Sequence, residues 1–526
     1  MQYRQKQDRF QLEVTCLDQM VAPDSFARVV DAFVDTLDVK ALGFTNHTLN
    51  AEGNIPYHPT DLIKLYLYGY RNGIRSCRKL AYACITNIEV MWMIGKLQPH
   101  FKTISDFRKD NPQAFKNTFR HFLLVLKGWK LIEGKAFAVD SFKIRAQNSL
   151  KNNFNDKKIK RHLEYIDQKI AEYEAALDEE LPQKKETIIQ DKIKDQEKKK
   201  EKYEALHKQL EDTEDGQIST TDPDSRAVVF QRTSVKVGYN IQAASDDKHK
   251  LLVAFDTGDV NDTHQLANVT KQAMQNTQSE KCTVLADKGY HTGIQLDECE
   301  KMNATPFVAP KANSASVTND VFPVESFLYN KKEDTYTCPA QETLTTNGTV
   351  YTRKSKKKGA KDIKFKHYTT TACKTCLLKA QCTNRKQGRI VQRSEYQDAI
   401  DRNKKRVEVN AAYYRERQQI IEHQFGTLKR QWHLDHTLVR TKEKVLTEIA
   451  IAFTVYNLRR TMSIFNPIEL IKQLKAIKTA IFSFLSTTFT TKPHTTKSTP
   501  HILLKKPLNF QKHILYLHLK SPGFVG

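Results

Sequence analysis

The stretch TVLADKGY at residues 283–290 decides the fold that we expect for this chain. Its first four residues are apolar or β-branched, as in a short buried strand, and Asp287 follows them directly. The stretch AFAVD at residues 136–140 has the same form and ends in Asp140. The stretch IIEHQFG at residues 420–426 lies in a helical pattern and carries Glu422. We expect two acids at strand ends and one acid on a helix to converge.

The segments between these acids indicate the fold class. Residues 235–244 and 251–257 alternate with a period of two and are separated by a turn, which predicts an antiparallel hairpin. A helical pattern at residues 262–277 then leads into the strand that precedes Asp287. This order predicts an α/β fold, a ribonuclease H-like (retroviral-integrase-like) catalytic core with a mixed sheet flanked by helices.

Composition narrows the class of partner. The 526 residues carry a formal net charge of +24, which favours a polyanion, either nucleic acid or an acidic membrane surface. Runs of about eighteen apolar residues are absent from the sequence, and the first residues lack the apolar centre of a signal peptide. We therefore expect no membrane partner and a cytoplasmic, nucleoid-associated protein.

Patterning divides the chain into three regions and two insertions. Residues 1–130 read as a helical DNA-binding domain, with Arg71 and Arg75 on a basic face; a solvated helix surface is the alternative. Residues 131–463 form the expected catalytic core, and 464–526 a basic tail rich in Lys, Thr and Pro.

The first insertion, residues 155–212, is rich in charge and has heptad spacing. We interpret it as an antiparallel coiled-coil hairpin broken near Pro182, with a single solvated helix as the alternative. Its apolar positions before the break are Ile159, Leu163, Ile166, Ile170, Tyr173 and Leu177.

The second insertion, residues 325–395, carries a group of cysteines with metal-ligand spacing. They are Cys338, Cys373, Cys376 and Cys382. A Cys-x2-Cys pair with two further thiols can supply a tetrahedral structural Zn²⁺ site, and the surrounding insert is too poor in apolar residues for a core of its own. Four unliganded thiols are the alternative.

The three acids together suggest phosphodiester chemistry. Any one Asp after an apolar run is more often a turn or cap residue, but the ordered triple on so basic a chain is a stronger signal. Hard Mg²⁺ or Mn²⁺ ions prefer carboxylate ligands, and two such ions can activate a nucleophile and stabilise a leaving oxygen. We expect Asp140 to bridge the ions, Asp287 to hold one and Glu422 the other.

The helix around Glu422 carries further charge. Lys429 lies seven residues after Glu422, so in a continuous α-helix the two side chains share a face. Arg417, Arg430 and Tyr414 are nearby in the sequence. We expect these residues to contact DNA, and a surface ion-pair helix is the alternative.

These motifs jointly resemble a known family. ADKGY at 286–290 and EHQFGTLKR at 422–430, with YHP at 57–59, TISDFR at 103–108 and TDPDSR at 221–226, are similar to the DDE transposases of bacterial insertion sequences. More narrowly, they resemble the group numbered eleven eighty-two, within the superfamily that has a Tyr-Arg-Glu-Lys helix. The resemblance spans roughly residues 1–463.

The resemblance implies a Mg²⁺-dependent enzyme that cleaves and joins double-stranded DNA at the terminal inverted repeats of its own element. It implies that Asp140, Asp287 and Glu422 are the catalytic triad, that Lys429 contacts the element ends, and that a homodimer assembles on paired ends and target DNA. The chain departs from the family at the position four before Glu422, which is Gln418 instead of Arg. A metal-dependent nuclease of the same fold and a catalytically silent DNA-binding protein are the alternatives.

Overall fold

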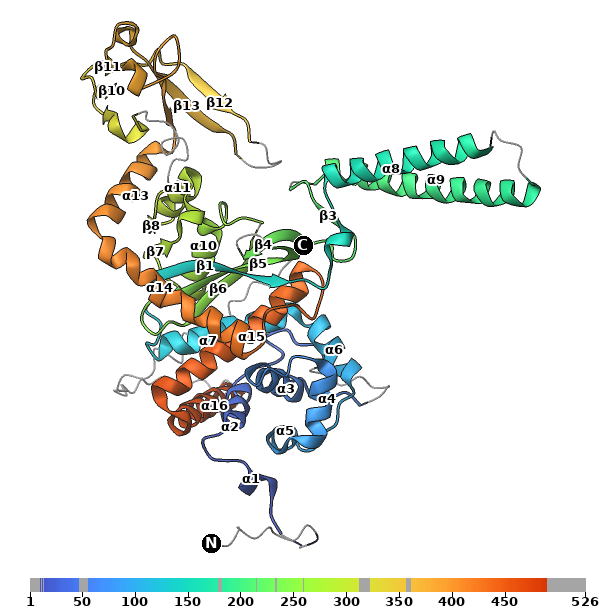
Figure 1. Cartoon of the computed structure of the whole chain (residues 1–526). Coiled ribbons are helices and arrows are strands. Elements are labelled where there is room, and N and C mark those ends of the chain that lie inside the picture. The colour runs from blue at the N-terminus through green and yellow to red at the C-terminus, as the bar shows by residue number, and fades with distance from the viewer. Residues whose placement is uncertain are drawn as a thin grey trace, which may run out of the picture.

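A computed structural model describes residues 10, 12 and 14–489, apart from 47–54, 178–181, 214, 232–233, 259, 312–321 and 356–360. Its centre is a mixed six-stranded sheet with the strand path β4-β5-β1-β7-β8, in which β6 also pairs with β5 (Figure 1). β1 is antiparallel to β5 and parallel to β7, and β7 is parallel to β8. The strands are β1 (Ala136–Arg145), β4 (Arg226–Gln231), β5 (Ser234–Asp246), β6 (Leu252–Gly258), β7 (Cys282–Ala286) and β8 (Ala304–Val308).

The structure confirms the expected hairpin of β5 and β6, and it corrects the expected end of β1. The strand does not stop at Asp140 but continues to Arg145, because each residue from Phe137 to Arg145 keeps a partner in β5. The sequence after Asp140 alternates polar and apolar side chains, and Phe142 and Ile144 are buried. Asp140 therefore lies within a strand, whereas Asp287 follows the last residue of β7 as expected.

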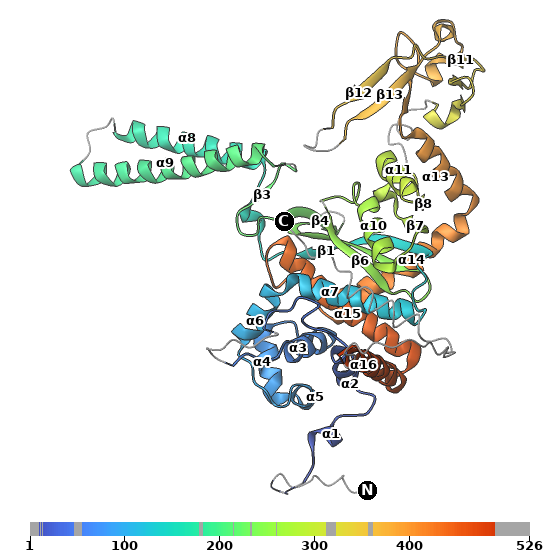
Figure 2. The same ribbon diagram turned by 180° about the vertical axis from the view of Figure 1, so that it is seen from behind.

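Helices cover the sheet on both faces. α14 (Ala411–Gly426) packs against β1, with the rings of Phe142 and Phe425 4.7 Å apart. α10 (Leu266–Thr277) packs against β6, β5 and β1, and Figures 1 and 2 show it on the opposite side of the sheet from α14. The other helices that flank the sheet are α11 (Gly293–Lys301), α13 (Gln397–Val409) and α15 (Lys442–Phe465).

The N-terminal helices share one hydrophobic core with the sheet. α7 packs against α15 and α10, α3 packs against α15, and one buried cluster contains residues of the N-terminal helices, the sheet and its covering helices, from Val21 to Ile477. The expected boundary near residue 130 is thus a change of secondary structure and does not separate two cores. These helices are α1 (Leu17–Met20), α2 (Phe26–Val34), α3 (Pro59–Arg71), α4 (Cys77–Thr86), α5 (Ile88–Met93), α6 (Phe101–Asp110) and α7 (Pro112–Gly128).

The first insertion forms the expected helical hairpin. α8 (Asp156–Leu177) and α9 (Gln183–Glu211) pack side by side and project from the sheet (Figures 1 and 2). At its base, β2 (Asn153–Phe154) pairs with β3 (Ile218–Ser219), so the chain leaves and re-enters the core at one place. A separate small apolar cluster, which includes Phe154 and Leu206, fixes the hairpin to this base.

The second insertion forms two small three-stranded sheets beyond the end of α13 (Figure 1). Its strands are β9 (Leu328–Asn330), β10 (Thr335–Thr337), β11 (Thr343–Leu344), β12 (Val350–Arg353), β13 (Ile363–Tyr368) and β14 (Val391–Ser394).

The region expected to be an irregular tail begins with a helix. α16 (Pro467–Phe489) packs against α2 and α15 and buries Leu470 and Leu474. This corrects the expected start of the tail at residue 464. Residues 490–526, including the apolar patch at 514–517, lie outside the described residues.

Candidate active site

Asp140 and Asp287 lie on neighbouring parallel strands. Val139 is opposite Ala286 in the register of β1 and β7, and each Asp is the next residue along its chain. The Asp287 side chain accepts a hydrogen bond from the Lys288 N–H at 2.7 Å, which caps a short 3₁₀ turn. The strand pairing therefore places two carboxylates side by side.

Asp140 is largely buried, and its surroundings disfavour the charged form. Burial, together with the negative charges of Asp287 and Asp262, raises the pKa of Asp140 to about 6. The Ser141 N–H, which donates to Asp140 Oδ1 at 2.7 Å, and the nearby Arg417 guanidinium both oppose this shift. Several carboxylates therefore lie close together at this site, and their negative charge favours the binding of a cation.

Arg417 supplies the positive charge that reaches two of the acids. Its guanidinium donates to Asp140 Oδ2 at 3.2 Å and lies 3.9 Å from Glu422 Oε1. The Arg417 side chain is 10% exposed, whereas that of Glu422 is 53% exposed. The strand acid and the helix acid therefore meet at one buried guanidinium.

Tyr414 attaches the same helix to the other strand. Its hydroxyl donates to the carbonyl of Ala286 at 3.2 Å, at the residue before Asp287. Tyr414 and Arg417 are three residues apart on α14 and so lie on one face of the helix. This face contacts the strand positions of both Asp residues.

The helix is not continuous as far as Lys429, contrary to expectation. α14 ends at Gly426, and residues Thr427–Gln431 form a π-helical turn, which changes the direction in which later side chains point. Burial lowers the pKa of Lys429, while the charges of Asp435 and Lys143 act on it in opposite directions. Arg430 is exposed. Lys429 thus lies near the β1 side of the site, but the regular two-turn spacing from Glu422 does not hold.

Arg75 is not on a basic face. Its guanidinium is buried, donates to the carbonyl of His436 at 2.6 Å and pairs with Glu448 at 3.4 Å. The expected DNA contact by Arg75 is therefore contradicted, because a guanidinium held inside the core cannot reach a phosphate. Arg71 is partly exposed, with its guanidinium 6.0 Å from the ring centre of Trp432.

A fourth carboxylate, Asp262, lies beside the site and was missed by the sequence reasoning. Its Oδ1 accepts hydrogen bonds from the side-chain amides of Asn240 at 2.8 Å and Gln242 at 2.7 Å. The Tyr290 hydroxyl donates to the side-chain oxygen Oε1 of Gln242 at 2.5 Å, which links this network to the turn after Asp287. The only sequence signal was an acid in the loop between β6 and α10.

The carboxylates of Asp140, Asp287 and Glu422 have the chemistry that suits a hard divalent cation, although Arg417 pairs with two of them, Asp140 and Glu422. Across the residues that the structure describes, no three His, Cys, Asp or Glu side chains are arranged to hold a metal ion as they stand. Asp140, Asp287 and Glu422 nevertheless supply oxygen donors from adjacent elements, and carboxylate oxygens are the ligands that Mg²⁺ and Mn²⁺ prefer.

No helix in the described part of the chain is long and apolar enough to cross a membrane.

Comparisons with known proteins identify the family. The transposase DDE domain family matches residues 215–458, and a second family, described as a transposase domain, matches residues 15–110. No curated protein and no solved structure gives a significant match. The DDE match includes Asp287, Arg417 and Glu422, and it implies a ribonuclease H-like core, with which the mixed sheet is consistent. The chain belongs to the DDE transposases of insertion sequences.

Proposed function

We propose that this transposase cleaves and joins DNA at the ends of its own insertion sequence, with Asp140, Asp287 and Glu422 as its catalytic acids. The observation that carries the proposal is the Arg417 guanidinium, which lies between Asp140 and Glu422. It brings to one point a strand acid and a helix acid that are far apart in sequence. Asp287 lies next to Asp140 through the parallel pairing of their strands.

The strand order supports the finer fold assignment. In the sheet, β1 lies between the antiparallel strands β5 and β6 on one side and the parallel strands β7 and β8 on the other, and the acids come from β1, from the end of β7 and from the helix α14. We assign this arrangement to a ribonuclease H-like core, and within the family we favour the group numbered eleven eighty-two.

Asp140, Asp287 and Glu422 would hold Mg²⁺ or Mn²⁺. When bound, such ions lower the pKa of a nucleophilic water or hydroxyl and stabilise the departing oxygen. The chain itself contributes a rigid strand pair that fixes the two Asp side chains and a helix that fixes Glu422. Tyr414 holds that helix against the strand end through its bond to Ala286.

Arg417 has a second role in this proposal. A guanidinium binds a phosphate as well as it binds a carboxylate. Arg417 would therefore contact the scissile phosphate when its charge is not needed to neutralise Asp140. Lys429 and Arg430 would contact the DNA backbone on the β1 side, and Arg71 would contact it from the N-terminal helices.

The regions around the core have proposed roles as well. Residues 1–130 would recognise the inverted repeats, and the basic segment after α16 would add phosphate contacts that weaken with salt. A homodimer on paired ends, bound to target DNA in the cytoplasm near the nucleoid, completes the proposal.

The test is cleavage of supercoiled DNA that carries the repeats flanking the gene, in the presence of Mg²⁺. Wild-type protein should cut at the repeat boundary, and Asp287→Asn and Glu422→Gln should lose cutting while retaining DNA binding. Glu416→Gln is the matched control, because Glu416 is an exposed acid on the same helix. It should cut like the wild type.

A second substrate separates the alternatives. Precleaved ends with a free 3′-hydroxyl should be joined to target DNA by a transposase, whereas a nuclease would cut without joining. Repeat binding without cutting under Mg²⁺ or Mn²⁺ would contradict the enzymatic proposal and leave a DNA-binding protein.

A further inference from the structure

The second insertion has a small apolar core of its own, contrary to the expectation from its sequence. Five buried apolar residues form its cluster, and this cluster is separate from the main core of the protein. Domains with so little buried apolar surface usually need a further staple, such as a metal ion or disulfides. The cluster consists of Phe327, Tyr336, Leu344, Tyr368 and Val391.

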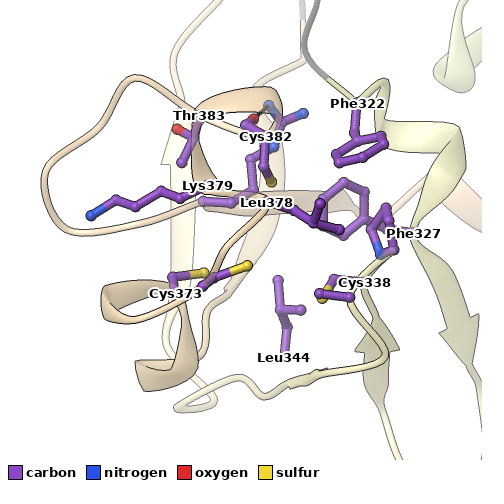
Figure 3. A pocket seen from close by; sticks show the side chains of 13 residues that line it. Phe322, Phe327, Cys338, Leu344, Cys373, Leu378, Lys379, Cys382 and Thr383 are labelled. Atoms are coloured by element: carbon purple, nitrogen blue, oxygen red, sulfur yellow. Dashed lines mark hydrogen bonds between the residues drawn. The ribbon is translucent and has the colours of Figure 1, made fainter.

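Four thiols from separate segments line one cavity of this insertion (Figure 3). We call them the cysteine cluster. Its members are Cys338, Cys373, Cys376 and Cys382, and all four are unpaired and partly buried. The first follows β10, the next two lie in and after a 3₁₀ turn (Thr371–Lys374), and the last follows a second 3₁₀ turn (Lys379–Gln381). Cysteine side chains from segments up to 44 positions apart in the sequence therefore line the same cavity.

The cavity has the size of an ion site. Its interior is about 20 Å³, which is room for roughly one water-sized sphere and too small for an organic ligand. Apart from the thiols, its walls are mainly apolar and include Phe322, Leu344 and Leu378. A small space lined by sulfur and hydrocarbon suits a soft or borderline metal ion and offers little to a hard one.

The backbone around the cavity is closely fitted. Gly388 has a φ of +98°, and a Cβ atom there would lie 2.5 Å from Cys373 Cβ, so the chain at this position packs directly on the cluster. The next residue, Arg389, donates to the carbonyl of Cys382 at 3.0 Å and lies over the ring of Phe327. These contacts hold the two sides of the cavity together.

The sulfurs surround the cavity without meeting at one point. Figure 3 shows Cys338, Cys373 and Cys382 on different walls, and in the described part of the chain no three potential ligands are arranged to hold an ion as they stand. A cysteine side chain changes the position of its sulfur by rotation about a single bond, between staggered wells of similar energy. Binding of a metal ion would therefore require rotation of the cysteine side chains, whereas the backbone already surrounds the cavity.

We propose that the cysteine cluster binds one structural Zn²⁺ ion, which stabilises the second insertion. Each thiol that binds loses its proton to solvent, and the four thiolates complete a closed tetrahedral site. With four protein ligands, no position remains for water or substrate, so the ion has no part in the cleavage of DNA. This proposal does not depend on the proposed catalytic acids.

The first test is the metal content of the full-length protein, purified without chelators and measured by plasma mass spectrometry. We expect about one zinc per chain in the wild type and nearly none in Cys376→Ser or Cys382→Ser. Cys16→Ser is the matched control, because Cys16 is exposed and lies outside the insertion, and it should retain the zinc. Wild-type protein without zinc that also fails to bind added Zn²⁺ would overturn the proposal.

A second measurement does not depend on how the variants fold. Wild-type protein reconstituted with Co²⁺ should show the absorption of a tetrahedral site with thiolate ligands. Chelation of the metal should make the insertion sensitive to protease while α15 and the sheet remain resistant. A Co²⁺ spectrum typical of oxygen ligands, or disulfides within the cluster found by mass spectrometry of the native protein, would contradict the zinc site.

Discussion

The substitution Glu448→Gln tests the connection between the N-terminal helices and the rest of the fold. Glu448 on α15 is 1% exposed and forms ion pairs with Arg108 at 2.9 Å and Arg75 at 3.4 Å. It also accepts hydrogen bonds from the Tyr70 hydroxyl at 3.1 Å and the Leu438 N–H at 2.9 Å. One carboxylate therefore neutralises two buried guanidinium groups that come from the N-terminal region.

Glutamine keeps the shape of the side chain but removes its charge. Breaking a buried ion pair by removing one partner costs about 3–5 kcal/mol, since the remaining charge stays in the interior. Two Arg charges depend on Glu448, so we expect a loss of about 4 kcal/mol or more in the free energy of unfolding. The Arg side chains have little exposed surface, so solvent cannot compensate them.

Urea unfolding followed by tryptophan fluorescence is a suitable assay. Trp92, Trp129 and Trp432 all pack against the main core, so their emission reports on this unit. Glu443→Gln is the control on the same helix, because Glu443 is exposed, and it should change stability by less than about 0.5 kcal/mol. If Glu448→Gln lowers the free energy of unfolding by less than about 1 kcal/mol, the premise that Glu448, Arg75 and Arg108 are shielded from water is refuted.

Three further predictions concern pH, cation binding and the hairpin. Burial raises the pKa of Asp246 to about 6, so the folded protein binds this proton more tightly than the unfolded chain does. As pH rises from about 4 to about 6, wild-type protein should lose up to about 3 kcal/mol of stability relative to Asp246→Asn, as measured by urea unfolding; a constant difference would contradict this. Arg417→Gln removes the cation that competes for Asp140 and should tighten Mn²⁺ binding in calorimetry; unchanged or weaker binding would show that Arg417 does not compete. Replacing residues 168–199 by a short Gly-Ser loop should leave the unfolding midpoint of the core unchanged, and a large decrease would show that the outer hairpin supports the core.

Local patterns predicted much of the fold. The strand patterns of β5 and β6, the heptads of α8 and α9, and the apolar run before Asp287 each predicted the right type of element, although β5 and β6 are buried at consecutive positions and not at alternate ones. The continuation of β1 after Asp140 and the helix α16 also have sequence signals, a period of two after Asp140 and a spacing of three to four between Leu470, Leu474 and Ile477. The error at β1 concerns the length of a strand, whereas the error at α16 concerns a separate helix that was expected to be irregular chain.

The environment of individual charges could not be predicted. Arg75 is adjacent in sequence to exposed basic residues, and only its pairing with Glu448, 373 positions away, shows that it is internal. Asp262 likewise depends on amides from β5, and the position of Lys429 depends on a π-helical turn that its sequence spacing does not reveal. Long-range pairing decides whether a charged side chain faces DNA, a metal ion or the core.

The link between Tyr70 and Glu448 also has a consequence for the synthesis of the protein. These partners are 378 positions apart, and α15 emerges from the ribosome only when most of the chain has been made. Until then, the apolar side of α3 and α7 has no cover, and during translation such surfaces favour aggregation or chaperone binding. Glu422 is also translated late, so an incomplete chain lacks one of the three proposed catalytic acids. Under the proposed function, a truncated product would be prone to degradation and unable to cleave DNA.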